Sequence, residues 1–183
     1  MSQDNPDIRQ QVDASRGFQK KLELLIPGLR TYRTQEDIRV ADDMLRNQVA
    51  DKLDQTKANL ENLRKQMVNA GDFTNLTPVG SLIFQVQQVS GEVRHAQQGY
   101  SGFVANISVN ADRLNKLYEY DYNFVNSAFQ LYSATSPQNL IYDPTAASSI
   151  QTKVSAVSSA LADFKSQWST RMEAVENILV KGQ

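Results

Sequence analysis

The chain of 183 residues is long enough for one domain with a sizeable core, and its hydrophobic content of 40% is ordinary for a globular protein. Its 19 basic and 20 acidic residues leave a formal net charge of -1, which gives no global electrostatic ground for binding nucleic acid or an anionic membrane. The lack of cysteine excludes disulfides, thiolate metal sites and cysteine nucleophiles, and it fits a reducing cytoplasm.

The first two predicted helices span approximately residues 6–25 and 35–70. In both, apolar residues recur at steps of three and four residues, which is the pattern of a helix with one buried face. We expect Pro27-Gly28 to end the first helix, because proline cannot continue it. Gly71 is expected to end the second helix in a left-handed cap.

The third and fourth predicted helices span approximately residues 79–104 and 110–134. Between them the helical signal weakens, because Asn, Ser and β-branched residues are poor helix formers. Two structures fit this stretch: a continuous rod of about 50 residues, or two helices separated by a break. We predict the break, at residues 104–110.

The fifth predicted helix, approximately residues 144–181, has an apolar stripe with no Gly or Pro in it. The stripe consists of Ile150, Val154, Val157, Leu161, Phe164, Trp168, Met172, Val175 and Leu179. Three of the five predicted helices begin with a capping side chain directly before a proline, a typical start signal. These pairs are Asn5-Pro6, Thr77-Pro78 and Asp143-Pro144.

An apolar stripe on one helix is buried only when other stripes pack against it. We therefore predict an all-α protein, an antiparallel bundle of four to five long helices that forms a single domain over residues 1–183. The second and fifth helices are expected to exceed the third and fourth by about 10 residues, or roughly 15 Å. Either the first helix or a second copy of the chain would cover this overhang.

An acidic residue, Asp121, interrupts the apolar seam of the fourth predicted helix. Its neighbours in the pattern are expected to be buried, and a buried carboxylate requires a partner. The second predicted helix carries charges of alternating sign at steps of three and four residues. We predict that Asp121 pairs with Arg39 or Arg46, with the hydroxyl of Tyr118 or Tyr122 nearby. The hypothetical polar network consists of Asp121, Arg39, Arg46, Asp43 and Tyr118.

The sequence predicts no catalytic, cofactor or metal site. Glu92 and His95 have the spacing that diiron bundles use, but such bundles use it twice with two further Glu, and His95 is the single His of this chain. The same scarcity argues against a Ser-His-acid triad, and no Gly-rich phosphate loop is present. The neighbouring carboxylates Asp42 and Asp43 are typical of a helix surface.

Two blocks of the chain resemble an uncharacterised family of prokaryotic helical proteins with a Leu/Ile-Pro-Gly, Tyr, Glu, Arg, Asp, Leu-Arg pattern. The first block is Ile26-Pro27-Gly28, Tyr32, Glu36, Arg39, Asp42, Leu45 and Arg46. The second block is Gly99-Tyr100, Phe103, Leu114, Leu117-Tyr118 and Asp121. Ile26 stands where that family usually has Leu. The resemblance implies a helical protein and no activity.

Three classes of function are compatible with these features. A non-enzymatic bundle that binds another protein or itself fits best, because long amphipathic stripes need partners and no reactive constellation is present. A peripheral membrane or envelope-stress adaptor is the second, although the fifth predicted helix carries Ser and Gln where a membrane-surface helix carries Lys and Arg. The third is an enzyme or small-ligand binder with its site in the bundle core, around Asp121.

The expected partners are therefore a protein or a second copy of the chain, and not nucleic acid. The first residues are polar, and no apolar run approaches the roughly 20 residues that span a bilayer, so we expect neither an export signal nor an integral membrane segment. The expected location is the cytoplasm.

Overall fold

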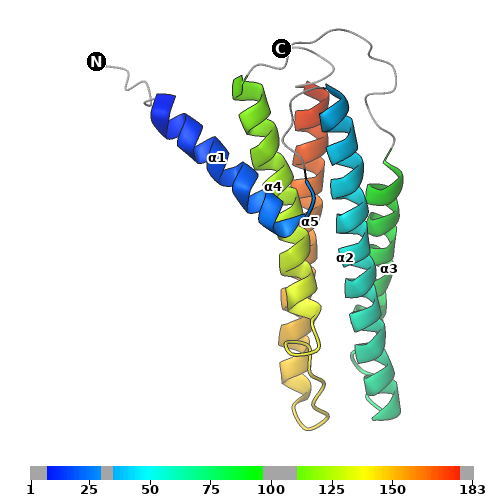
Figure 1. Ribbon diagram of the computed structural model, residues 1–183. Coiled ribbons are helices and arrows are strands. Elements are labelled where there is room, and N and C mark those ends of the chain that lie inside the picture. Colours follow the sequence, from blue (N-terminus) through cyan, green and yellow to red (C-terminus); the bar gives the residue numbers. More distant parts are fainter. Residues whose placement is uncertain (1–7, 30–34, 97–110, 178–183) are drawn as a thin grey trace, which may run out of the picture.

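The computed structural model describes residues 8–29, 35–96 and 111–177. These residues form helices and turns without a β-strand, as predicted for an all-α protein. The helices are α1 (Ile8–Leu25), α2 (Gln35–Asn69), α3 (Leu76–His95), α4 (Ala111–Thr135) and α5 (Ala147–Val175) (Figure 1).

Four of these helices, α2 to α5, form an antiparallel bundle in which each helix contacts two neighbours. The neighbouring pairs are α2 with α3, α2 with α4, α4 with α5, and α3 with α5. In Figure 1, α2 and α4 run downwards and α3 and α5 run upwards, so α3 and α5 are parallel to each other. The predicted antiparallel bundle is therefore confirmed.

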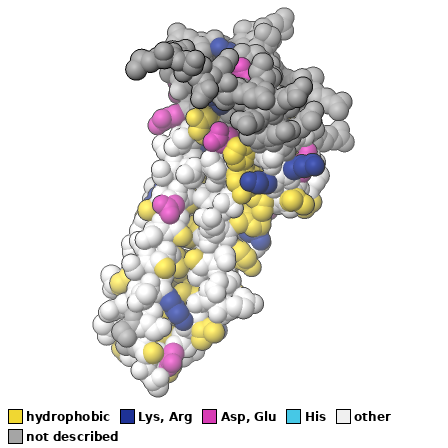
Figure 2. Space-filling model, turned by 90° about the vertical axis from the view of Figure 1, so that its left-hand side faces the viewer, with side chains coloured by type: hydrophobic (Ala, Val, Ile, Leu, Met, Phe, Trp, Pro, Cys, Tyr) yellow, Lys and Arg dark blue, Asp and Glu magenta, His cyan; other side chains and the backbone are white. Residues whose placement is uncertain are grey.

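Helix α1 lies outside this bundle, against α4, and its N-terminal end diverges from the bundle (Figure 1). The rings of Phe18 in α1 and Tyr122 in α4 pack with their centroids 5.6 Å apart. Figure 2 shows this side of the molecule, where hydrophobic side chains form a broken band below the grey residues and only scattered hydrophobic and charged side chains appear further down. The first helix therefore covers α4.

The core consists of the apolar stripes of the bundle helices. On α5, the stripe residues Ile150, Val157, Leu161, Phe164 and Val175 are buried. Two members of the predicted stripe, Trp168 and Met172, are only partly buried. They face the space between α3 and α5, which is described below.

Helix α2 ends as predicted, at a glycine with a left-handed backbone. Gly71 has φ 74°. Its N–H donates to the carbonyl of Val68 at 3.1 Å, and the N–H of Asp72 donates to the carbonyl of Met67 at 3.0 Å. This pair of bonds is a Schellman motif, which satisfies carbonyls that the helix end leaves without helical partners.

Replacing Gly71 by Ala should lower the free energy of unfolding by about 1 kcal/mol, because a Cβ disfavours positive φ. Gly80→Ala, inside α3, is the matched control and should raise it by up to about 1 kcal/mol, the difference in helix propensity. An added Cβ meets no atom within 4 Å at either position, so both effects come from the backbone. Urea unfolding measures the free energy of unfolding of both variants. A change of the same sign in Gly71→Ala and Gly80→Ala would contradict this prediction.

Two of the predicted helix starts are wrong. Helix α3 begins at Leu76 after Asn75, so Thr77 lies inside its first turn. Helix α5 begins at Ala147, and Asp143 instead accepts hydrogen bonds from the backbone N–H and the hydroxyl of Thr145, at 2.8 and 2.7 Å, in the preceding turn. These bonds lower the pKa of the Asp143 carboxyl. The third pair, Asn5-Pro6, lies outside the described residues.

The end of α3 also differs from its prediction at residue 104. The helix ends at His95, and Ala96 follows in an extended conformation with φ -54° and ψ 116°. A continuous rod through α3 and α4 is therefore wrong, whereas the predicted break at 104–110 lies outside the described residues. Helix α5 was predicted to reach residue 181 and runs to Val175, with residues 178–181 also outside the description. None of the described helices is long and apolar enough to cross a bilayer.

Candidate functional site

A buried arginine of α5 connects three helices. Arg171 is 1% exposed, and its Nε donates to Oδ1 of Asp121 on α4 at 2.7 Å. Its Nη2 donates to Oδ1 of Asp42 on α2, also at 2.7 Å. Both carboxylates are buried, at 1% exposure for Asp121 and 5% for Asp42. One guanidinium therefore joins α2, α4 and α5 through charge-assisted hydrogen bonds.

A second arginine continues these contacts to α3. The Nε of Arg46 donates to Oδ2 of Asp42 at 2.8 Å, and its Nη2 pairs with Asp43. Its Nη1 faces the carbonyl oxygens of Val93, Arg94 and Ala96, at 3.5, 3.4 and 3.1 Å. These carbonyls belong to the end of α3, where the helix leaves them without helical partners and the helix dipole is negative. Arg46 therefore caps α3 from α2.

We call these five residues the ion network, namely Asp42, Asp43, Arg46, Asp121 and Arg171. Its two arginines balance the buried carboxylates of Asp42 and Asp121, and Asp43 is half-exposed at the edge. The Arg171 guanidinium also lies 5.2 Å from the ring centroid of Phe124, a cation–π contact. Replacing a buried ion pair by apolar residues is often neutral for stability, so we expect the ion network chiefly to fix how the helices align.

Three residues of the network predicted from the sequence lie in the ion network. Asp121, Arg46 and Asp43 belong to the ion network, but the hydrogen bond of Asp121 described above goes to Arg171 and not to α2. Tyr118 is buried on α4, and Arg39 is partly exposed on α2.

Two members of the ion network were missed. Asp42 was assigned to the helix surface and is buried between two arginines. Arg171 was not named, although it follows Trp168 by three residues and precedes Val175 by four, which is a stripe position. A charged residue at a stripe position was the signal that located Asp121, but at Asp42 and Arg171 this signal was ambiguous, because the adjacent residues Ala41 and Met172 fit the stripes as well.

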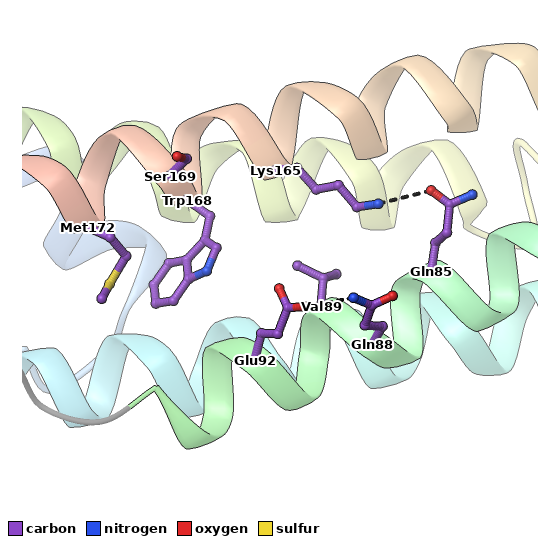
Figure 3. A pocket seen from close by; sticks show the side chains of 8 residues that line it. All are labelled: Gln85, Gln88, Val89, Glu92, Lys165, Trp168, Ser169 and Met172. Carbon is purple, nitrogen blue, oxygen red and sulfur yellow. Dashed lines mark hydrogen bonds between the residues drawn. The ribbon is translucent and has the colours of Figure 1, made fainter.

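Beside the ion network, α3 and α5 enclose an open groove with a volume of about 450 Å³ (Figure 3). The groove is lined by Gln85, Gln88, Val89, Glu92, Lys165, Trp168, Ser169 and Met172. Val89, Trp168 and Met172 supply its apolar surface. Lys165 donates to Oε1 of Gln85 at 2.9 Å across the groove, and Gln88 donates to Oε1 of Glu92 at 2.9 Å along α3. The groove therefore combines an apolar surface with one cationic and one anionic side chain.

The groove and the ion network share a wall of aromatic rings. The ring centroids of Trp168 and Phe124 are 5.0 Å apart, and Phe124 also packs on Phe164, at 5.7 Å. The Phe124 ring also contacts the Arg171 guanidinium, so Phe124 links Trp168 in the groove to the ion network.

The outer side of α3 is held by a second group of charges. Arg94 donates to Asp51 at 2.9 Å and to Asp54 at 2.8 Å, and the hydroxyl of Ser90 donates to Asp54 at 2.7 Å. The hydrogen bond to Asp51 is the main cause that raises the pKa of Arg94. These contacts tie α3 to α2, so that the opposite side of α3 faces α5.

Within the described part of the chain, no group of three or more His, Cys, Asp or Glu side chains is placed to hold a metal ion. Comparisons with protein-family models, with curated proteins and with solved structures give no match to this chain. The function must therefore be argued from the geometry of the groove and of the ion network.

Proposed function

We propose that this protein is a non-enzymatic helical bundle whose α3–α5 groove binds a helix of another protein chain. The observation that carries the proposal is the incomplete burial of the α5 stripe at Trp168 and Met172. Every other apolar member of that stripe up to Val175 is buried except Val154, which is partly buried. An apolar floor between two parallel helices is the surface on which an amphipathic helix docks.

The rim of the groove supports the same proposal. Phe84 on α3 is 68% exposed and lies one helical turn before Gln88, which lines the groove. Aromatic side chains that a partner removes from water contribute strongly to protein interfaces. A partner helix in the groove would cover Phe84 together with the half-buried Trp168.

A ligand site in the bundle core, around Asp121, has less support. The carboxylates of Asp121 and Asp42 are already paired with arginines, so neither of them calls for a ligand. The groove lies outside this core, and its open shape suits an extended partner.

Photo-crosslinking from position 84 tests the proposal. With benzoylphenylalanine in place of Phe84, irradiation in the native host should give a discrete adduct with a protein chain. Phe73, in the turn between α2 and α3, is the matched control, because it is also 68% exposed but lies away from the groove. Met172→Glu, which places a charge on the groove floor, should abolish the adduct at position 84.

Equal adducts from positions 73 and 84 would show that exposure alone drives the reaction. The absence of any adduct from position 84, or an adduct that survives Met172→Glu, would contradict binding in the groove. Mass mapping of the adduct then identifies the partner chain.

A further inference from the structure

We propose that the partner in the α3–α5 groove is a second copy of this chain, related to the first by a twofold axis that crosses the groove. This inference rests on the proposed function, since it uses the same surface. It is carried by the arrangement of charges and apolar side chains along the groove.

The groove has opposite charges at its two ends. Lys165 lies across from Gln85, and Glu92 lies two helical turns further along α3, which is about 10 Å. Met172 lies two turns beyond Lys165 on the parallel α5, and in Figure 3 it lies past Glu92, whereas Trp168 lies opposite Glu92. The groove therefore has a cationic end at Lys165 and Gln85, and an opposite, anionic end where Glu92 lies with the apolar side chains of Trp168 and Met172.

A twofold axis requires a surface that is complementary to itself. When two grooves face each other in antiparallel directions, Lys165 of each copy meets the partner's Glu92, and this contact is made twice. Both groups have bonding capacity left, because an ammonium has three donors and a carboxylate has two acceptor oxygens, and each makes one hydrogen bond described above. A parallel arrangement would instead place like charges together.

The exposed apolar side chains fit the same arrangement. Phe84 precedes Gln85, so it lies at the cationic end of its own groove. In the antiparallel pair it reaches the anionic end of the partner's groove, where the partner's Met172 and Trp168 are half-buried. Removing these side chains from water provides the attraction, and the charges set the direction. The net charge of -1 adds little repulsion between copies.

Charge reversal combined with sedimentation equilibrium tests this inference. The wild type should dimerise, and Glu92→Lys and Lys165→Glu should each weaken the homodimer at least about tenfold, because each places like charges together at both contacts. Mixing the two variants should restore a dimer that contains one copy of each. The double variant, with both charges exchanged, should dimerise like the wild type.

The control uses a surface ion pair outside the groove. Lys57 and Glu61 on α2 lie 3.6 Å apart, and reversing either charge should leave the dimer unchanged. Circular dichroism of each variant verifies that the helices are retained. A monomeric wild type, a mixture that does not recover, or an equal effect of the Lys57 and Glu61 reversals would overturn the inference.

The failure of this inference can be distinguished from the failure of the proposed function. If the wild type is monomeric while crosslinking from position 84 captures a different chain, the groove binds a foreign helix and only self-association is wrong. If neither a dimer nor an adduct forms, both proposals fail.

Discussion

Arg171→Met is expected to lower the free energy of unfolding by about 3–5 kcal/mol, the range seen when one partner of a buried ion pair is removed. Arg171 is the residue that Asp121 and Asp42 share, and both carboxylates are buried. Methionine keeps an unbranched apolar side chain at the position, so the loss arises mainly from charge. Urea unfolding followed by circular dichroism measures the change.

Two further variants separate charge from packing. Arg64→Met removes the same kind of side chain from an exposed position of α2 and should change stability by less than about 0.5 kcal/mol. Arg171→Met combined with Asp121→Leu should recover most of the loss, because Asp42 and Arg46 remain as a pair. A double variant no more stable than Arg171→Met would show that the loss comes from packing, contrary to our account.

Phe124→Ala is expected to destabilise the protein by a similar amount, about 3–5 kcal/mol, because it opens a cavity in the core. Phe124 is fully buried, and its ring contacts Phe164, Trp168 and the Arg171 guanidinium. Trp168 is the single tryptophan of the chain, so its fluorescence reports on this wall of the groove. We expect its emission to move to longer wavelength as water gains access to the indole.

Phe124→Leu should lower the free energy of unfolding by less, about 1.5 kcal/mol or below, because leucine fills most of the space that phenylalanine occupies. Phe84→Ala is the control for the loss of an aromatic side chain, and its exposed position predicts a change within about 0.5 kcal/mol when measured on dilute, monomeric protein. If Phe124→Ala and Phe84→Ala had equal effects, the aromatic wall would not support the groove as described.

The helices and their directions were predictable from the sequence because burial of one face imposes a repeat that is visible in residue types. The left-handed cap at Gly71 was predictable for a related reason, since few residues other than glycine adopt positive φ. The capping pairs before Pro78 and Pro144 misled because a capping side chain also forms isolated turns. The carboxylate of Asp143 does so with Thr145.

Arg171 was not predicted as a partner of Asp121, because the sequence alone does not fix which of two adjacent residues belongs to a helical stripe. On α5 we placed Met172 in the stripe, whereas the structure buries Arg171 and leaves Met172 partly exposed. Asp42 was misjudged in the same way, since it follows Ile38 by four residues and precedes Leu45 by three. Which of two adjacent residues faces the core depends on how the helices cross, and a single sequence does not contain that information.

The groove itself was not predicted, because it arises from the spacing of two helices that are not adjacent in the chain. The residues that line the groove form no recognisable sequence motif. Only the partial exposure of Trp168 and Met172 in the structure reveals the groove. From the sequence we expected the uncovered surface at the overhanging ends of the long helices instead.

Arg46 binds the last carbonyls of α3 and also shares Asp42 with Arg171 of α5. The two helices that border the groove are thus anchored, at the end nearest Glu92, to a single aspartate. Any axial sliding of α3 past α5 would have to break a charged contact that water does not replace. We therefore expect the groove to have a fixed width at its anionic end. An occupant would change the width mainly at the other end, near Lys165.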